Sequence, residues 1–148
     1  MACLRLSLRL DSLDATNALG ARLAAALRPG DAVLLRGPYG AGKTALARAT
    51  LRALAGDPNL EVPSPSYTLV QTYDTLLGPV HHFDLWRLDG PAAVAELGWD
   101  EARDSIVLAE WPERLGDLRP ADALEIALEL DGETARRATL TGWPERSL

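Results

Sequence analysis

The sequence predicts an α/β fold in which helices pack on a mixed β-sheet. Two observations favour this class: helical and strand-like segments alternate in the first half, and strand-like segments dominate the second half. Alternation is typical of parallel strands joined by helices, whereas consecutive strands usually pair antiparallel. Of the 148 residues, 47% are hydrophobic and 24% are charged, as in an ordinary globular protein. We expect a single domain over 1–148, with 143–148 as a loosely held tail.

Four elements are predicted in the first half of the chain. They are strands over 4–10 and 32–36, a helix from Ser12 or Asp14 to about Leu27, and a helix over 43–55. Leucine at every second position gives the first strand one buried face. Ser12 and Asp14 are both suitable helix caps, and "RPG" ends that helix. Gly56 and Pro58 stop the second helix.

Five strands and one short helix are predicted in the second half. The strands cover 67–73, 80–85, 105–109, 124–130 and 136–141, and the helix covers 91–97 and is closed by Gly98. The segment "VPSPS", residues 62–66, is expected to be an extended loop because residues before proline avoid the helical region. Turns are expected at Leu77-Gly78-Pro79 and at Asp131-Gly132, the latter inside a hairpin.

The segment "GPYGAGKT", residues 37–44, matches the phosphate-binding pattern G-x-x-x-x-G-K-[ST] without a mismatch. A strand is predicted before it and a helix after it, as the pattern requires. Its glycines let successive backbone N–H groups point at phosphate oxygens, and the helix N-terminus adds positive potential. A glycine-rich turn that merely precedes a helix is the alternative. The predicted nucleotide contacts are Gly37, Pro38, Tyr39, Gly40, Ala41, Gly42, Lys43, Thr44 and Ala45.

Within this loop, Lys43 is expected to bridge the terminal phosphates, and the Thr44 hydroxyl is expected to bind magnesium. Magnesium also takes carboxylate ligands. Asp84 and Glu110 each follow an apolar strand, in "VHHFD" and "SIVLAE". Either acid could instead be a helix cap or part of a solvated turn. We therefore predict an α/β sandwich in which Thr44, Asp84 and Glu110 serve the metal.

The segment "SPSYTLV" contains two hydroxyl side chains, Ser66 and Thr68, that could sense the terminal phosphate. A plain turn leading into a strand is the other interpretation. His81 and His82 are adjacent, so on a strand they face opposite sides, and one is expected in the core and one exposed. Zinc binding is disfavoured because no further ligand follows at metal spacing. The tryptophans are expected in the core or at interfaces, although Trp111 adjoins Glu110.

Charge and composition limit the partners. The net charge is −6 and the pI is about 4.9, which disfavours a domain that grips nucleic acid alone. No apolar run approaches the roughly 20 residues of a membrane span, and the start of the chain lacks a continuous apolar signal. The only cysteine, Cys3, excludes an internal disulfide and a cysteine-based zinc site. We expect a cytoplasmic protein. Arg136 and Arg137 could lie near the nucleotide or on a solvated strand edge.

Five ordered segments together resemble a known family. They are "GPYGAGKT", "SPSYTLV", "HFDLWRL", "ELGWDE" and "AEWPERL", and "ATNALGARLA" at 15–24 is similar to the family's first helix. The family is the bacterial ATPase needed for tRNA threonylcarbamoyladenosine synthesis, the TsaE (YjeE) family. The resemblance runs from about Leu10 to Gly142.

The resemblance implies a P-loop NTPase-like three-layer sandwich with a mixed, partly antiparallel sheet of about seven strands. It implies ATP and Mg²⁺ as ligands. It implies that Lys43 and Thr44 hold phosphate and magnesium, and that Asp84 and Glu110 serve the metal and the attacking water. It places Thr68 in a switch-like loop and makes Trp111 the family's tryptophan after the acid, and both residues are therefore predicted to contact the nucleotide. It also implies two transferase subunits that modify the adenosine beside the tRNA anticodon, with ATP hydrolysis resetting the complex. The ATPase would meet tRNA only indirectly.

Three positions depart from the family pattern. Tyr39 stands where leucine is usual, Ala45 stands where a second threonine is usual, and Trp86 replaces tyrosine. None of these changes removes a phosphate or metal ligand, so ATP binding is expected to survive.

Two rival functions remain open. A P-loop small-molecule kinase would need an acceptor pocket and usually an arginine-rich lid, and no lid insertion is visible in the sequence. A nucleotide-gated binding module would bind ATP without significant turnover. A Ras-type GTPase is disfavoured because no N-K-x-D stretch occurs.

Overall fold

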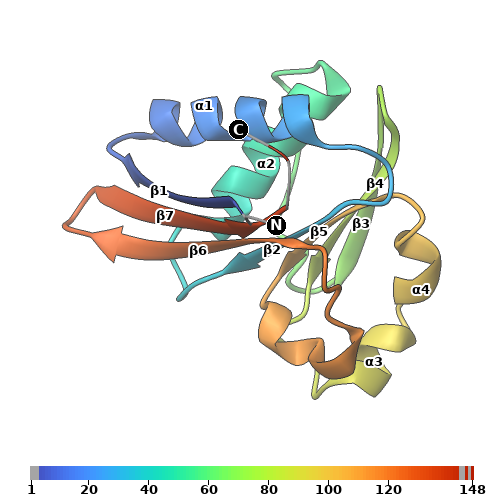
Figure 1. The fold of residues 1–148 in the computed structure, drawn as a ribbon. Coiled ribbons are helices and arrows are strands. Elements are labelled where there is room, and N and C mark those ends of the chain that lie inside the picture. The colour runs from blue at the N-terminus through green and yellow to red at the C-terminus, as the bar shows by residue number, and fades with distance from the viewer. Residues whose placement is uncertain (1–3, 144–145, 147) are drawn as a thin grey trace.

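The computed structural model describes residues 4–143, 146 and 148. In this part of the chain, seven strands form one sheet in the order β1-β7-β6-β2-β5-β4-β3 (Figure 1). The strands are β1 (Leu4–Leu10), β2 (Ala32–Arg36), β3 (Val70–Thr75), β4 (Gly78–Asp84), β5 (Ile106–Glu110), β6 (Leu124–Asp131) and β7 (Ala135–Gly142). The helices are α1 (Leu13–Ala26), α2 (Lys43–Ala55), α3 (Pro91–Ala95) and α4 (Trp99–Ala102), with 3₁₀ turns η1 (Pro112–Arg114) and η2 (Gly116–Leu118).

The sheet is mixed, as the sequence predicts. Its centre is parallel, because β2 pairs in parallel with β5 and β6, and β4 pairs in parallel with β5. Its margins are antiparallel, through the β6–β7 hairpin, the β1–β7 pair and the β3–β4 hairpin. The parallel centre brings the carboxyl ends of β2, β4 and β5 to one edge of the sheet, which is where ligands bind in open α/β folds.

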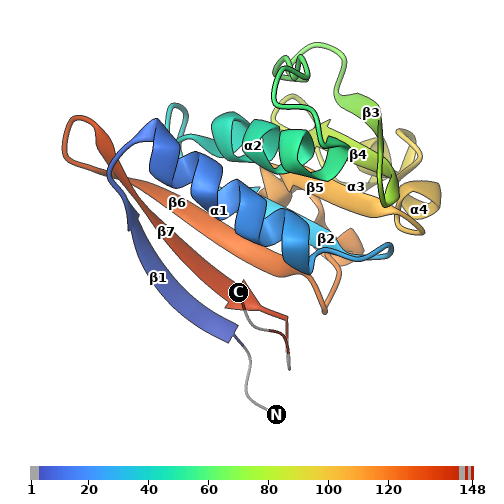
Figure 2. The same cartoon turned by 90° about the horizontal axis from the view of Figure 1, so that it is seen from above.

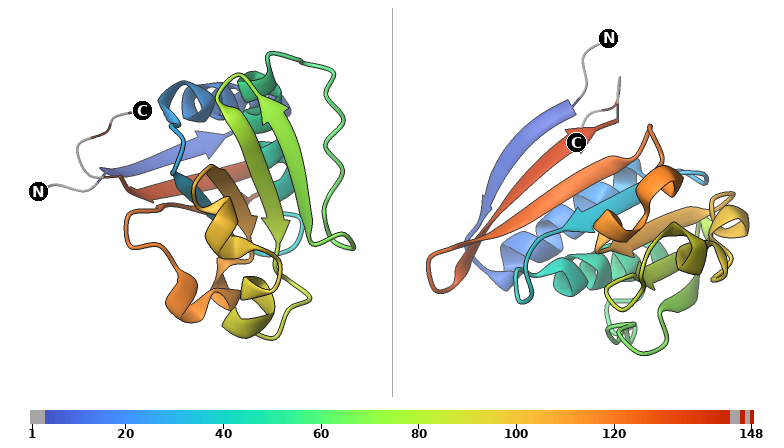
Figure 3. Two further views of the ribbon diagram at one scale, coloured as in Figure 1. Left: turned by 90° about the vertical axis from the view of Figure 1, so that its right-hand side faces the viewer. Right: turned by 90° about the horizontal axis from the view of Figure 1, so that it is seen from below.

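Helices cover both faces of the sheet and confirm the three-layer arrangement. Helices α1 and α2 lie side by side over one face (Figure 2), and α3, α4 and the 3₁₀ turns lie under the other (Figure 3). Two apolar clusters fill these interfaces. Strand β2 serves both, because Val33 and Leu35 join the cluster with α1 and α2 while Ala32 and Leu34 join the other.

Ser12 is the residue that caps α1. Its side chain accepts a hydrogen bond from the Ala15 N–H at 3.2 Å, which satisfies one of the free amides at the helix start. Further along α1, Gly20 allows a close approach to α2, since a Cβ at this position would lie 2.5 Å from the Ala49 Cβ and 2.8 Å from the Ala49 carbonyl carbon.

The strand expected over 67–73 is displaced along the chain. The structure begins β3 at Val70, because Tyr67 and Thr68 form a turn. The Leu69 N–H donates to the Pro65 carbonyl at 2.8 Å, and Leu69 adopts a φ of 71° that no strand residue has. The neighbouring strand β4 begins at Gly78, so the turn expected at 77–79 is made by Leu76 and Leu77 instead.

Two other segments differ from expectation. The helix expected over 91–97 ends at Ala95, and the separate short helix α4 follows Gly98, which has a φ of 84°. Strand β5 includes Glu110 as its last residue, one position beyond the expected strand. The predicted hairpin near Asp131 is confirmed by the pairing of β6 with β7.

The prediction of a loosely held tail is wrong for Trp143 and Arg146. Trp143 is 2% exposed and belongs to the core cluster that includes α1 and α2. The Arg146 guanidinium pairs with both carboxylate oxygens of Asp31, at 2.5 and 3.2 Å, and lies over the Trp143 ring. Positions 144, 145 and 147 lie outside the described residues.

Among the helices in the described ranges, none combines the length and the apolar character that a membrane span needs.

Candidate functional site: a phosphate-binding loop facing two carboxylates

The loop between β2 and α2 turns sharply at its glycines. Gly42 takes a φ of 100° where it caps α2, a conformation that residues with a Cβ rarely adopt. Gly37 lies so close to β6 that a Cβ there would collide with the Leu128 carbonyl oxygen. The loop therefore packs on the sheet, and the N-terminus of α2 points its free amides into the space beyond the strands.

Lys43, the first residue of α2, folds back over this loop. Its side chain is 5% exposed, and Nζ donates to the carbonyl oxygens of Gly37 at 2.5 Å and Pro38 at 3.0 Å. The ammonium also lies 4.1 Å from the centre of the Trp111 ring. Burial lowers the pKa of Lys43 below its usual value, although the nearby carboxylates of Glu110, Glu113 and Asp84 oppose this.

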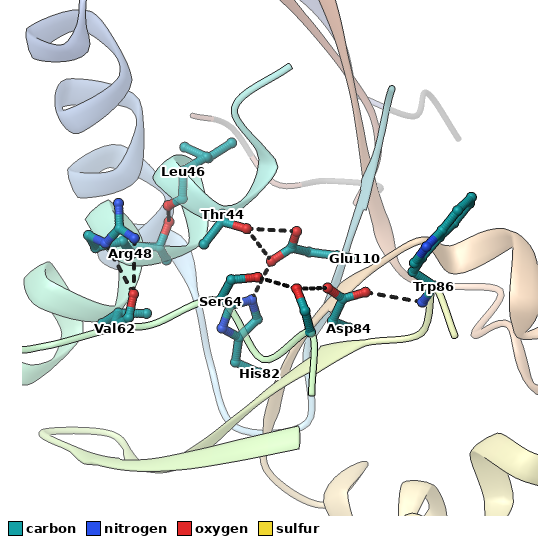
Figure 4. Close-up of polar contacts among 11 residues, drawn as sticks. Thr44, Leu46, Arg48, Val62, Ser64, His82, Asp84, Trp86 and Glu110 are labelled. Atoms are coloured by element: carbon teal, nitrogen blue, oxygen red, sulfur yellow. Dashed lines mark hydrogen bonds and ion pairs between the residues drawn. The ribbon is translucent and has the colours of Figure 1, made fainter. Parts of the chain in front are cut away.

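The two candidate carboxylates end adjacent strands. Asp84 and Glu110 are the last residues of β4 and β5, and they are register partners in the parallel pair. Both are buried, at 5% and 3% exposure. The Thr44 hydroxyl lies 3.0 Å from each oxygen of Glu110 and donates to this carboxylate (Figure 4). The structure thus brings the predicted phosphate loop into contact with Glu110 and places Asp84 in the lining of the same cleft.

Asp84 is held by the loop that precedes β3. Ser66 Oγ donates to Asp84 Oδ2 at 3.3 Å, and Ser64 and Ser66 share a hydrogen bond of 2.8 Å. On its other oxygen, Asp84 accepts from the Trp86 N–H at 3.0 Å. This loop is tied to α2 because the Arg48 guanidinium donates twice to the Val62 carbonyl, at 3.1 and 3.2 Å.

These groups surround a cleft of about 600 Å³. Its lining residues are Tyr39, Gly40, Gly42, Lys43, Thr44, Ala45, Ser64, Ser66, Asp84, Trp86, Glu110 and Trp111. Four predicted contacts are absent from this lining. Gly37 and Pro38 offer their carbonyls to Lys43, and Ala41 is buried in the core. Thr68 is exposed and accepts a hydrogen bond from Gln71. Ser66, the other hydroxyl predicted for this place, does line the cleft, together with Ser64.

The aromatic residues at the cleft have distinct places. Trp86 is 53% exposed and its ring centre lies 4.5 Å from that of Trp111. Trp111 follows Glu110 with a φ of 60°, an uncommon conformation for a bulky residue. Trp99 is remote from the cleft and packs edge-on against Phe83 in the second core cluster. Arg136, which the sequence leaves ambiguous, donates to the Gly40 carbonyl at 3.2 Å and so contacts the phosphate loop.

The sequence does not predict a role for His82 in the site. His82 is fully buried, and its Nε2 lies 2.7 Å from Glu110 Oε2. His81, on the opposite face, is partly exposed and shares a 2.9 Å hydrogen bond with Thr72. The signal that could have found His82 is its spacing: residues 82 and 84 share one face of a strand, and β4 lies beside the strand that ends in Glu110.

The donor set of this cleft suits a hard cation bound together with a phosphate. The Thr44 hydroxyl and the Asp84 and Glu110 carboxylates offer the oxygen ligands that Mg²⁺ prefers. Within the described residues, however, no group of three or more His, Cys, Asp or Glu side chains could hold a metal alone. The remaining ligands would have to come from the phosphates and water, as is usual for Mg²⁺ at nucleotide sites.

Comparisons with known proteins agree with this architecture. The family model described as "Threonylcarbamoyl adenosine biosynthesis protein TsaE" matches residues 10–138. A Rickettsia felis protein named tRNA threonylcarbamoyladenosine biosynthesis protein TsaE is 37% identical over 94% of this chain and 82% of its own length. The protein of that name from Bacillus subtilis is 30% identical over 86% of this chain and 80% of its own length.

A solved structure extends the likeness to three dimensions. The crystal structure of Bacillus subtilis YdiB is similar with a TM-score of 0.79 and 28% sequence identity, covering 96% of this chain and 88% of that one. The family match spans both strand-end acids and the whole phosphate loop. This chain belongs to the TsaE family, a family of nucleotide-binding P-loop proteins of tRNA threonylcarbamoyladenosine biosynthesis.

Proposed function

We propose that this protein binds ATP with Mg²⁺ in the cleft and hydrolyses it in support of threonylcarbamoylation of the adenosine next to the tRNA anticodon. It would act with transferase subunits that carry out the transfer, and its hydrolysis cycle would reset the complex between turnovers. One observation carries the proposal: the Lys43 ammonium, the Thr44 hydroxyl and the carboxylates of Asp84 and Glu110 line a single cleft.

The phosphate loop supports triphosphate binding. The α2 N-terminus supplies backbone N–H donors and the positive end of a helix dipole, and Lys43 adds a full charge. Lys43 now donates to carbonyls of its own loop, so bound phosphate oxygens would replace these acceptors. Burial lowers the pKa of Lys43, and a phosphate anion at this position would offset that effect by stabilising the ammonium form.

The strand-end acids support hydrolysis. Thr44 and Asp84 would hold Mg²⁺ directly or through water, and the ion would neutralise charge on the terminal phosphates. Glu110 would accept a hydrogen bond from the attacking water and orient it toward the terminal phosphorus. The water oxygen would then form the new P–O bond as the bond to the bridging oxygen breaks, a proton of the water would pass to an oxygen of the transferred phosphate, and ADP and phosphate would leave.

The names of the relatives support the tRNA-modifying role. The Rickettsia felis and Bacillus subtilis proteins are both named for tRNA threonylcarbamoyladenosine biosynthesis. The net charge of −6 argues that a partner subunit, rather than this chain, holds the tRNA, because tRNA affinity depends on Lys and Arg neutralising phosphates.

The decisive experiment is an ATPase assay of the purified chain with and without the transferase subunits, with tRNA modification measured in parallel. We expect slow hydrolysis alone and faster hydrolysis in the complex, with modification that depends on ATP. ADP release that requires a small phosphoryl acceptor would instead identify a kinase. ATP binding without turnover in the complete complex would identify a nucleotide-gated binding module.

A further inference from the structure

The buried pair of His82 and Glu110 is the starting point. Both side chains lie inside the domain, at 0% and 3% exposure, and Nε2 lies 2.7 Å from Oε2. Glu110 receives side-chain hydrogen bonds from two described residues, Thr44 on α2 and His82 on β4 (Figure 4). The carboxylate is therefore held between a helix and a neighbouring strand.

The contacts of His82 define which nitrogen donates. An ionised carboxylate only accepts, so Nε2 must carry the proton in this contact. The other ring nitrogen, Nδ1, is buried without a hydrogen-bond partner among the described residues. All the hydrogen bonding that this ring makes in the described structure is thus directed at Glu110. A ring placed only for packing would not need this alignment, and an apolar side chain would fill the space without leaving a bare nitrogen.

The second donor to Glu110 has another task. If the Thr44 hydroxyl oxygen binds magnesium, as proposed above, the hydrogen bond from Thr44 to Glu110 can change its length and direction. His82 lies on β4, outside the phosphate loop, and has no other hydrogen-bond partner in the part of the chain that the structure describes. It is the donor that can keep Glu110 in one orientation while Thr44 engages the metal.

We propose that His82 is a positioning residue for ATP hydrolysis: its Nε2–H fixes the Glu110 carboxylate in the orientation that aligns the attacking water. This inference rests on the proposed ATPase function. His82 acts through Glu110 and does not touch the nucleotide, since it is absent from the cleft lining. The consequence is a specific kinetic signature, in which turnover falls while ATP affinity is kept.

The test compares two amides at position 82. The amide nitrogen of glutamine in His82→Gln reaches about as far as Nε2 and can donate to Glu110. The shorter asparagine of His82→Asn places its amide near Nδ1 and cannot. In the presence of the transferase subunits, we expect kcat of His82→Asn to fall about 10- to 100-fold, the usual effect of losing an orienting partner. The kcat of His82→Gln should stay within about threefold of wild type, and ATP affinity by calorimetry should be unchanged in both.

Two controls sharpen the comparison. His81→Asn changes the adjacent histidine on the opposite face of β4 and should leave kcat and ATP affinity unchanged. In a Glu110→Ala background, adding His82→Asn should cause no further loss of kcat, because the residue acts through that carboxylate.

The outcomes separate the inference from the function on which it rests. If wild type hydrolyses ATP but the Asn and Gln variants have equal kcat, or if His82→Asn loses ATP affinity together with kcat, His82 has no positioning role and the ATPase proposal stands. If adding His82→Asn to Glu110→Ala lowers kcat as much as His82→Asn does in the wild type, His82 does not act through Glu110 and has no positioning role. If wild type does not hydrolyse ATP even in the complex, the ATPase proposal fails and this inference fails with it.

Discussion

At the scale of single residues, the site depends on charges that the fold has removed from water. Lys43 is the only lysine in the chain, and its ammonium lies buried beside three carboxylates and an indole ring. A buried charge is stable only when it has partners, and a phosphate group is a stronger partner than the two loop carbonyls that now accept from it.

Replacement of Lys43 by alanine is expected to lower the ATPase rate by about 10²- to 10³-fold, because the transition-state charge on the phosphates loses the Lys43 ammonium. Steady-state hydrolysis in the complex measures this. Arg137→Ala, which removes a surface guanidinium paired with Asp131, is the control and should hydrolyse ATP normally. Wild-type turnover by Lys43→Ala would show that the phosphate site has been misassigned.

Glu110 is expected to serve turnover more than binding. Glu110→Gln keeps the size of the side chain but removes the charge that accepts from the water, so ATP should still bind while kcat falls by about 10²-fold or more. Calorimetry and single-turnover hydrolysis would separate the two effects. Glu101→Gln alters an exposed acid on α4, away from the cleft lining, and should change neither. Full activity of Glu110→Gln would move the water-orienting role to Asp84.

His81 gives a prediction for stability against pH. Burial lowers its pKa below the usual 6.5, so the unfolded chain binds this proton more readily than the folded chain does. The free energy of unfolding therefore loses a contribution as the pH falls through 6.5. We expect wild type to lose more stability than His81→Gln between about pH 8 and about pH 5, measured by urea unfolding. An equal loss in the two proteins would mean that His81 is not perturbed in this way.

At the scale of the elements, the close contact of α1 with α2 supports the helix that carries the phosphate loop. Gly20 makes this contact possible, since a Cβ would press against the backbone of Ala49 and Thr50, at 2.8 and 2.9 Å. These two atoms, the Ala49 carbonyl carbon and the Thr50 nitrogen, belong to the backbone of α2, which cannot move aside as a flexible side chain can.

Gly20→Ala is therefore expected to destabilise the protein, although alanine is the better helix former by about 1 kcal/mol. Overpacking of this kind costs about 1–3 kcal/mol. Chemical denaturation would measure the free energy of unfolding. The control is Ala21→Ser, on the exposed side of the same helix, which should change stability by less than about 0.5 kcal/mol. A gain in stability from Gly20→Ala would show that α1 and α2 are less closely packed than described.

The elements also show what the sequence could and could not predict. Alternating leucines and the apolar runs gave β1, β2, β5 and the β6–β7 hairpin, because each depends on local patterning and turn chemistry. The predicted start of β3 was wrong because a turn closes between Pro65 and Leu69. The left-handed residue of this turn is Leu69 rather than a glycine, so the sequence does not mark it as a turn. The same turn places Thr68 outward, whereas Ser64 and Ser66 face the cleft.

At the scale of the whole molecule, strand order decides which predicted residues meet. The sequence located Lys43, Thr44, Asp84 and Glu110 one at a time, each at the end of a strand or the start of a helix. Their convergence follows from the parallel pairing of β2, β5 and β4, which aligns the carboxyl ends of the three strands. The contact of His82 with Glu110 depends on that same order. Local pattern predicted that one of His81 and His82 is buried, but neither which one nor its contact with Glu110.

The seven-stranded sheet and its three layers were predictable, in part through the resemblance to the TsaE family. The burial of Trp143 and the ion pair of Arg146 were not predictable. The ion pair joins Arg146 to Asp31, which lie far apart in the sequence, and no periodic pattern marks the core position of Trp143.

The most direct test of the account is calorimetric titration of ATP into the purified chain with and without Mg²⁺, alone and together with the transferase subunits. We expect saturable ATP binding that Mg²⁺ strengthens and that Lys43→Ala weakens. Absence of magnesium-dependent ATP binding under all of these conditions would contradict it.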